Sequence, residues 1–142
     1  MKQLTDFDIG YLAGVIDGEG SLAIEKLSPR KNRKYCYFTP RLVVVNTNKQ
    51  LMDWLVNKIG GKYHARKLIV GRKQCYSWFI FGKLIEKVIK LIIPLLICKR
   101  QLAELILQFR ETVGKTGWHV TEEVLQLRNS MYLKSRELNK LG

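Results

Sequence analysis

The spacing of apolar residues along the chain predicts helices and strands in a repeated order. Apolar residues three or four apart predict amphipathic helices, and alternation of apolar and polar residues predicts strands. The first helix is expected from residue 6 to about residue 17, with Thr5 or Asp6 as its N-cap. The elements expected after it are strands at 21–28 and 37–46, a helix at 51–59, strands at 62–70 and 74–81, and helices at 84–93, 99–113 and 121–141.

Glycine and proline residues mark the breaks between these elements. Gly60-Gly61 ends the helix at 51–59, Gly71-Arg72-Lys73 predicts a hairpin turn, and Pro94 interrupts the helix at 84–93. Hairpins join antiparallel neighbours. We therefore expect an α+β fold with a four-stranded antiparallel sheet, helices on one face and the other face free. The 142 residues contain no Pro-rich or Ser-rich linker, which predicts a single domain over 1–142.

Composition adds a strong positive charge that is concentrated in one third of the chain. The formal net charge is +13, and residues 26–73 hold thirteen Lys or Arg but only one acid, Asp53. Such a surface attracts a phosphate backbone through counterion release and steering. A generally basic protein with solvated lysines is the alternative. Interleaved aromatic residues favour nucleic-acid binding, and these are Tyr35, Tyr37, Tyr63, Tyr76 and Trp78.

Cysteine usage and hydropathy indicate an intracellular setting. The cysteines, at positions 36, 75 and 98, are odd in number and widely spaced, which disfavours disulfides and a zinc site. The longest apolar run, Leu91–Cys98, contains Pro94 and is too short to span a bilayer. No apolar signal core follows Met1. We expect a reducing compartment, either an organelle (mitochondrion or chloroplast) or a prokaryotic cytoplasm, and no membrane partner.

Several nuclease and nucleotide chemistries are excluded by missing motifs. No acid is followed two positions later by lysine, so the carboxylate-x-lysine nuclease core is missing. His64 and His119 lie far apart in the sequence, which leaves a histidine-based metal-finger nuclease unsupported. The phosphate-binding GxxxxGK[ST] loop is also missing, and NTP hydrolysis is unsupported.

Glycines at positions 10, 14 and 18 form a stripe along the first predicted helix. Residues four apart lie on the same face of a helix, so this stripe has no side chains. Each glycine costs about 1 kcal/mol relative to alanine in a helix. A chain would keep such a stripe mainly where another backbone comes very close.

Two acids, Asp17 and Glu19, stand at the C-terminal end of the same helix. The helix dipole is already negative there, so carboxylates are unfavourable unless a positive group lies nearby. A divalent metal ion would supply that charge. A short helix with glycine caps and solvated acids is the alternative interpretation.

The nine residues Leu12–Gly20, LAGVIDGEG, resemble the signature of the LAGLIDADG homing endonucleases. Residue order, glycine spacing and the two acids agree, as does the predicted order of elements. In that family one motif per chain implies a homodimer, and two motifs imply a pseudo-symmetric monomer. This chain has one motif, and the resemblance implies that two motif helices pack together at the centre of a dimer. The residues expected at this interface are Gly10, Ala13, Gly14 and Asp17.

The resemblance also implies roles for residues near the motif. Glu19 matches the metal-binding carboxylate, with the Gly18 carbonyl as a further ligand, and Asp17 matches the first acid, a structural one that closes the helix end. The family more often has Asp at the position of Glu19, although Glu also occurs. Asn46 resembles the polar residue at a strand end, and Lys99 the basic residue that positions water and offsets charge. A turn asparagine and a lysine at a helix N-terminus are the respective alternatives.

Phosphodiester hydrolysis requires an activated water, a stabilised leaving oxygen and relief of charge on the phosphate. The resemblance implies Mg²⁺ for this chemistry, with Mn²⁺ or Ca²⁺ as substitutes and Ca²⁺ non-catalytic. A dimer would bring two Glu19 carboxylates to its two-fold axis. Such like charges repel without cations between them, which again favours a metal.

DNA contacts are expected from alternate residues of the strands, because successive side chains point to opposite faces. If Glu19 sets the register, the expected contacts from strands and hairpin are Ser21, Ala23, Glu25, Leu27, Tyr37, Thr39, Arg41, Arg66, Lys67, Arg72, Gln74, Tyr76 and Trp78. The basic loop is expected to touch phosphates or outer bases through Arg30, Lys31, Arg33 and Lys34. A slip of one residue would reverse every face.

The sequence therefore predicts a homodimeric homing endonuclease that makes a staggered double-strand break in a long, partly palindromic DNA site. Such proteins are typically encoded within introns or inteins. Two alternatives remain open. An RNA maturase would assist splicing of its host group I intron, and a DNA-binding regulator would keep the fold without the chemistry.

Overall fold

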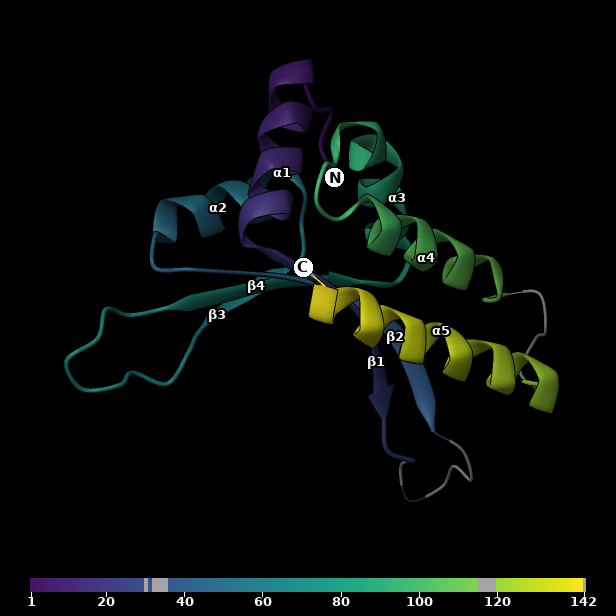
Figure 1. Cartoon of the computed structure of the whole chain (residues 1–142). Helices are drawn as coiled ribbons and strands as arrows, with labels where there is room; N and C mark the ends of the chain where they lie inside the picture. The colour runs from purple at the N-terminus through teal and green to yellow at the C-terminus, as the bar shows by residue number, and fades with distance from the viewer. Residues whose placement is uncertain (30, 32–35, 115–119, 142) are drawn as a thin grey trace.

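A computed structural model describes residues 1–29, 31, 36–114 and 120–141 of the chain. Its elements are α1 (Asp6–Glu19), β1 (Gly20–Leu27), β2 (Tyr37–Asn46), α2 (Lys49–Lys58), β3 (Lys62–Ala65), β4 (Tyr76–Phe81), α3 (Gly82–Ile92), the 3₁₀ turn η1 (Ile93–Leu95), α4 (Arg100–Glu111) and α5 (Glu122–Leu141). Figure 1 shows their arrangement. The α+β class and the repeated helix–strand–strand order predicted from the sequence are confirmed.

The strands form one antiparallel sheet in the order β1-β2-β4-β3. β1 with β2 and β3 with β4 make two hairpins, which extend in different directions (Figure 1). Gly20 pairs with Val44, and Arg41 pairs with Phe81. The first residues of the central strand β2 therefore pair only with β1, and its last residues pair only with β4. Pro40 falls in the first of these one-sided segments, where a missing N–H is tolerated.

One face of the sheet is covered by helices and carries the core. In β1 and β2 the buried side chains alternate with more exposed ones and pack against these helices. The sheet residues of this core with at most 2% exposure are Leu22, Ile24, Leu42, Val44, Trp78 and Ile80. The helices add Leu12, Ile16, Ile85, Ile89, Ile106 and Phe109, among others. The opposite face carries no helix in the described part of the chain (Figure 1).

Helix α1 begins with a capping box and ends at the sheet. The Thr5 hydroxyl accepts the backbone N–H of Asp8 at 3.1 Å, and the Asp8 carboxylate accepts that of Thr5 at 2.9 Å. This confirms Thr5 as the N-cap. The C-terminal end of α1 points to the sheet, and β1 begins directly after it at Gly20 (Figure 1).

The second hairpin differs from the prediction in its strand ends. β3 ends at Ala65 and β4 begins at Tyr76, whereas strands at 62–70 and 74–81 were expected. The side chains of Leu68, Ile69 and Val70 are 59, 56 and 99% exposed, so these residues have little packing that would stabilise a longer strand. The base of the longer loop is closed by the Arg66 N–H, which donates to the Cys75 carbonyl at 2.8 Å.

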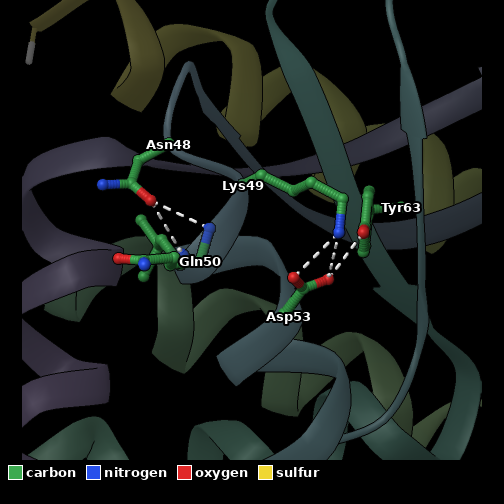
Figure 2. A network of polar contacts seen from close by, with 6 residues as sticks. Asn48, Lys49, Gln50, Asp53 and Tyr63 are labelled. Carbon is green, nitrogen blue, oxygen red and sulfur yellow. Dashed lines mark hydrogen bonds and ion pairs between the residues drawn. The ribbon is translucent and has the colours of Figure 1, made fainter.

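A polar network fastens β3 to α2 (Figure 2). The Asp53 carboxylate accepts the Tyr63 hydroxyl at 2.6 Å and the Lys49 ammonium at 2.9 Å. These two contacts, with the Tyr63 hydroxyl contributing most, lower the pKa of Asp53. Asn48 caps α2 by accepting the Gln50 N–H at 2.9 Å. Gly61 makes the turn into β3 at φ +77°, and a Cβ there would meet the Phe79 carbonyl oxygen at 2.7 Å.

The last helices complete the layer over the sheet. Pro94 lies in η1, which confirms that it ends the preceding helix. α5 runs beside the edge strand β1, and the Asn139 side-chain amide donates to the Leu22 carbonyl at 3.0 Å. A covered edge is protected from pairing with other chains. Within the described residues, no helix combines the length and apolar character needed to cross a membrane.

Candidate functional site

The carboxylate of Asp17, at the end of α1, lies against the residues that lead into α4, which are 80 to 82 positions away in the sequence. It accepts the backbone N–H groups of Ile97 at 2.7 Å, Cys98 at 3.3 Å and Lys99 at 3.1 Å. Lys99 is the N-cap residue of α4 and makes no side-chain cap of its own. Asp17 therefore fixes the turn Ile97–Lys99 that leads into α4, by accepting its three successive backbone N–H groups.

These contacts determine the protonation of Asp17. Burial alone would raise the pKa of its carboxyl, but the three backbone N–H groups outweigh this effect and the pKa is lowered. The sequence suggested a metal as the positive partner for the acids of the motif. For Asp17 the partner is instead the N-terminal end of α4, together with Lys99. The expected structural role of Asp17 agrees with this geometry.

A second hydrogen bond to Asp17 holds the Lys99 side chain against the end of the motif helix. Its ammonium group donates a hydrogen bond to the backbone carbonyl of Asp17, in the last turn of α1. A cation at that position also offsets the partial negative charge of the helix C-terminus. Asp17 and Lys99 are thus joined twice, once through a side-chain acceptor and once through a side-chain donor. This clamp places a positive charge beside Gly18 and Glu19.

Glu19 is the exposed last residue of α1. In the part of the chain that is described, its carboxylate makes no hydrogen bond or ion pair, so its oxygens are available to a ligand. No group of three or more His, Cys, Asp or Glu side chains that could hold a metal occurs among the described residues. Glu19 would therefore need the Gly18 carbonyl, a phosphate or a second chain to complete a cation site.

Asn46 lies at the end of β2, at the same end of the sheet as Gly20. Its side-chain carbonyl accepts the N–H of Asn48 at 2.8 Å and shapes the turn into α2. This is the turn role that the sequence allowed as an alternative. The amide nitrogen of Asn46 makes no hydrogen bond with the described residues, so a further role is compatible with the turn.

The open face of the sheet confirms the predicted register of β1 and β2. Buried residues alternate with partly or fully exposed ones in both strands, and the expected residues Ser21, Ala23, Glu25, Tyr37, Thr39 and Arg41 belong to the second group. Glu25 and Arg41 form an ion pair at 3.1 Å, so part of their charge is compensated within the chain. The Arg41 guanidinium also lies 5.0 Å from the centre of the Phe79 ring.

On β4 the predicted register is wrong by one residue. Trp78 is fully buried, and its indole N–H donates to the Gly60 carbonyl at 2.8 Å. Tyr76 lies on the same side and packs against the core and Tyr63. The run YSWFIF is apolar on both faces, so alternation of polarity does not define its register.

The residues that β4 presents to the open face were missed by the sequence analysis. Phe79 and Phe81 alternate with the buried Trp78 and Ile80, and Ser77 lies on the same side as the two phenylalanines but is only 6% exposed. The rings of Phe79 and Phe81 are stacked, with centroids 6.3 Å apart. The paired strand β3 adds Lys62 opposite Phe79 and His64 opposite Ser77. Pairing with β2 is the signal that sets this register, and it is a tertiary one.

The remaining predicted DNA contacts lie mostly in loops. The Gln74 side-chain amide donates to the carbonyls of Arg66 at 2.7 Å and Cys75 at 2.9 Å, so it closes the hairpin instead of pointing outwards. The side chains of Arg66, Lys67 and Arg72 are exposed in the same loop. The exposed residues Leu27 and Lys31 flank the first loop. Arg30, Arg33 and Lys34 lie outside the described residues.

The predicted dimer interface divides into two groups. Gly10, Gly14 and Gly18 are exposed, and a Cβ built on any of them would meet nothing within 4 Å. Ala13, in contrast, is 3% exposed and faces the core of its own chain. Its side chain therefore packs within its own chain, and its place at a dimer interface stays a prediction. The Asp17 carboxylate is likewise committed to α4 in its own chain.

Aromatic side chains border the glycine stripe. Phe7 is 88% exposed and Tyr11 is 54% exposed on α1. Tyr11 packs edge-on against Trp54 of α2, with ring centroids 4.9 Å apart. A shallow hollow of about 460 Å³ lies between the two helices and is lined by Phe7, Asp8, Tyr11, Asn48, Gln50, Leu51 and Trp54. This bare and partly aromatic face is unlike a solvated helix surface.

Comparison with known proteins identifies the fold. No family model matches the sequence, and no curated protein matches it significantly. The homing endonuclease I-CvuI, in complex with uncleaved I-CreI target DNA and Mg, aligns with a TM-score of 0.78 at 20% identity, over 93% of this chain and 82% of that chain. The homing endonuclease I-TnaI aligns with a TM-score of 0.71 at 18% identity, over 98% and 96% of the two chains.

A third structure, the I-LtrWI LAGLIDADG homing endonuclease bound to target DNA, aligns with a TM-score of 0.74 at 21% identity. It matches 94% of this chain but only 46% of that one. The chain therefore has the fold of the LAGLIDADG homing endonucleases, as the resemblance of LAGVIDGEG implied. This chain corresponds to about half of I-LtrWI and to nearly the whole of I-TnaI.

Proposed function

We propose that this chain is a metal-dependent DNA endonuclease that acts as a homodimer and makes a staggered double-strand break in a long, partly palindromic site. One observation carries the proposal. The exposed Glu19 lies directly after the Asp17–Lys99 clamp, at the point where α1 reaches the sheet. A carboxylate without a partner and a fixed cation are thereby placed together at the edge of a basic sheet.

The homodimer follows from the number of catalytic groups and from the surface of α1. One chain has one motif and one Glu19, and its described residues form no complete metal site. A double-strand break requires reaction at two phosphodiesters. The exposed stripe of Gly10, Gly14 and Gly18 allows close approach of a second α1, and Phe7 and Tyr11 offer apolar area beside it. A two-fold interface that uses the same patch on both copies fits these features.

The donor set fits a hard divalent cation. Glu19 offers carboxylate oxygens and Gly18 a backbone carbonyl, the ligand types preferred by Mg²⁺. When bound, Mg²⁺ supplies charge relief on the phosphate and lowers the pKa of a bound water, and Mn²⁺ could replace it. Two I-CvuI structures with DNA include Mg or Ca in their conditions. In this chain Ca²⁺ is expected to support DNA binding without cleavage.

The chain's own residues then hold and polarise the reacting groups. Asp17 fixes the start of α4, which keeps Lys99 at the end of α1. One N–H of the Lys99 ammonium is used by the Asp17 carbonyl, which leaves two for a water or a phosphate oxygen. Asn46 can orient the attacking water through its amide nitrogen. Its carbonyl oxygen stays in the turn.

The open face would read the DNA sequence. Side chains on alternate positions of the strands reach base edges in the major groove. Arg41 and Glu25 offer charged hydrogen-bonding groups, and Phe79 and Phe81 offer apolar contact. Two copies related by a two-fold axis would read the same half-site in opposite directions, which makes the full site long and partly palindromic.

The direct test uses DNA in which the host element is absent, made by joining the sequences that flank the gene's intron or intein. Wild-type protein with Mg²⁺ should cut this joined DNA into two fragments with staggered ends. EDTA should stop cleavage, and Ca²⁺ should leave a bound, uncut complex. The control substrate is the same DNA with the intron or intein still in place between the two flanking sequences. Failure to cut the joined DNA with either Mg²⁺ or Mn²⁺ would contradict the proposal.

A further inference from the structure

Arg128 on α5 is a buried arginine at the end of another helix. It is 8% exposed, its Nε donates to the Thr112 hydroxyl at 3.0 Å, and its Nη2 donates to the Thr112 carbonyl at 3.0 Å. Its guanidinium carbon lies 5.5 Å from the centre of the Phe109 ring. Arg128 thus caps the C-terminal end of α4 and packs against it. These contacts use two of the five N–H donors of the guanidinium.

The charge of Arg128 has no acidic side-chain partner among the described residues. Among the described residues no carboxylate forms an ion pair with it, and residues 30, 32–35, 115–119 and 142 contain no Asp or Glu. Burial accordingly lowers the pKa of the Arg128 guanidinium. The neighbouring Arg110 differs, because Glu86 pairs with it at 3.3 Å. A buried cation without a counter-charge is costly unless a ligand supplies that charge.

The free side of Arg128 opens into a small cavity. Nη1 of Arg128 makes no hydrogen bond with the described residues and is not among the buried unpartnered atoms of that part of the chain, so it keeps access to the space beside it. The cavity measures about 120 Å³, room for roughly four waters at about 30 Å³ each. Its walls include Tyr37, Thr39, Phe81, Arg110 and Val113.

The position of the cavity connects it with the open face of the sheet. It lies where β2 runs past the end of β4, at the first four residues of β2. Tyr37 and Thr39 line it and also belong to the open face. A ligand that extends along the open face past Phe81 would therefore reach the cavity that Arg128 lines. Arg128, which belongs to the helical layer, thereby places its positive charge beside the open face at this cavity.

We propose that this cavity is a phosphate-binding site, in which Arg128 receives a backbone phosphate from the outer part of the bound DNA. The inference rests on the proposed function for the source of the phosphate, although the site itself would also accept inorganic phosphate. A guanidinium fork matches two oxygens of a phosphate group. The Tyr37 hydroxyl and Arg110 supply further donors in the same walls.

Two variants and one matched control separate the binding role from the capping role. Arg128→Met keeps the length of the side chain and removes its charge, whereas Arg128→Lys keeps the charge without the fork. Arg136→Met removes a charge from an exposed position on the same helix, where the polar and cation–π contacts of Arg136 with the described residues are to Tyr132. The three proteins are compared with wild type in two measurements.

The first measurement uses inorganic phosphate alone and does not depend on DNA binding. Phosphate should raise the melting temperature of wild type and of Arg136→Met above the value in chloride at equal ionic strength, by mass action on the folded state. The rise should be lost in Arg128→Met and reduced in Arg128→Lys. Absence of the rise in wild type would overturn the site, even if Arg128→Met does not fold.

The second measurement uses target DNA. Each phosphate contact contributes about 0.9 to the slope of log K against log salt. A dimer with two such cavities should therefore lose about 2 from this slope in Arg128→Met, while Arg128→Lys keeps most of it and Arg136→Met keeps all of it. An unchanged slope in Arg128→Met with normal cleavage by wild type would refute the inference and leave the proposed function intact. If wild type does not cleave target DNA, the proposed function is contradicted instead. The measurement with inorganic phosphate then still tests whether Arg128 binds phosphate.

Discussion

Lys99 donates two hydrogen bonds to Asp17, one from its backbone and one from its side chain. The Lys99 backbone N–H donates to the Asp17 carboxylate at 3.1 Å, and the Lys99 ammonium donates to the Asp17 carbonyl. The residues are 82 positions apart in sequence, so this pair ties the end of α1 to the start of α4. It also separates the two acids of the motif. Asp17 is used inside the chain, whereas Glu19 remains exposed.

Asp17→Ala should therefore destabilise the fold, and Glu19→Ala should not. Removal of the Asp17 carboxylate leaves three backbone N–H groups at the start of α4 without their acceptor. Loss of the hydrogen bonds to this charged acceptor should cost about 1–3 kcal/mol. Glu19→Ala removes a carboxylate with no protein partner in the described residues and should leave the free energy of unfolding within about 0.5 kcal/mol of wild type. Urea unfolding checks both values, and equal losses would contradict the division of roles.

The stabilising effect of the Asp17 charge should disappear in acid. Its pKa is lower in the folded chain than the ordinary value of 3.8, so the unfolded chain binds the proton more readily. The stabilisation is complete above the unfolded pKa and is lost as the pH falls through the folded pKa. The difference in unfolding free energy between wild type and Asp17→Asn should be constant near neutral pH and shrink below 3.8. A difference that grows in acid would contradict the lowered pKa.

Gly14→Leu tests the glycine stripe as a dimer surface. A side chain at Gly14 meets nothing within its own chain, so the monomer should remain folded. The larger residue should prevent the close approach of a second α1, and sedimentation should show a shift from dimer to monomer. Gln108→Leu adds the same side chain at an exposed position of α4 and should remain dimeric. A Gly14→Leu protein that stays dimeric with wild-type affinity would refute the interface.

The neighbours Trp78 and Phe79 should respond differently to substitution by alanine. Trp78 is fully buried, and its loss should cost about 3–5 kcal/mol of unfolding free energy. Phe79 faces the open side of the sheet, where it contacts Arg41 and Phe81. Phe79→Ala should cost much less stability but weaken binding to target DNA. Thermal unfolding and DNA titration of both variants measure this contrast. The reverse pattern would restore the register first expected from sequence.

The sequence was sufficient where one local signal decided the structure. Thr5 or Asp6 as a capping residue predicts the start of α1, and Pro94 predicts the end of α3. The alternation of residues after Glu19 predicts the faces of β1 and β2. The nonapeptide predicted the fold, because its glycines and acids form a pattern that few other proteins share. Each of these predictions depends on residues close together in the chain.

The sequence was insufficient where distant residues decided the structure. The face of β4 is set by pairing with β2 and by the contact of Trp78 with Gly60, because apart from Ser77 its run is apolar or aromatic on both faces. Ala13 looked like part of the glycine stripe, yet its face of α1 is covered by the chain's own core. The partner of Asp17 lies 80 to 82 residues away, which no local spacing reveals.

Cleavage of target DNA by Glu19→Gln is the most direct test of the central proposal. Glutamine has nearly the same shape but no charge, and Glu19 has no structural contact in the described chain to lose. With Mg²⁺, wild type should convert the joined flanking DNA into two staggered fragments, while Glu19→Gln binds the same DNA at least as tightly and leaves both strands intact. Cleavage by Glu19→Gln at the wild-type rate would contradict the assignment of Glu19 as the metal-binding carboxylate.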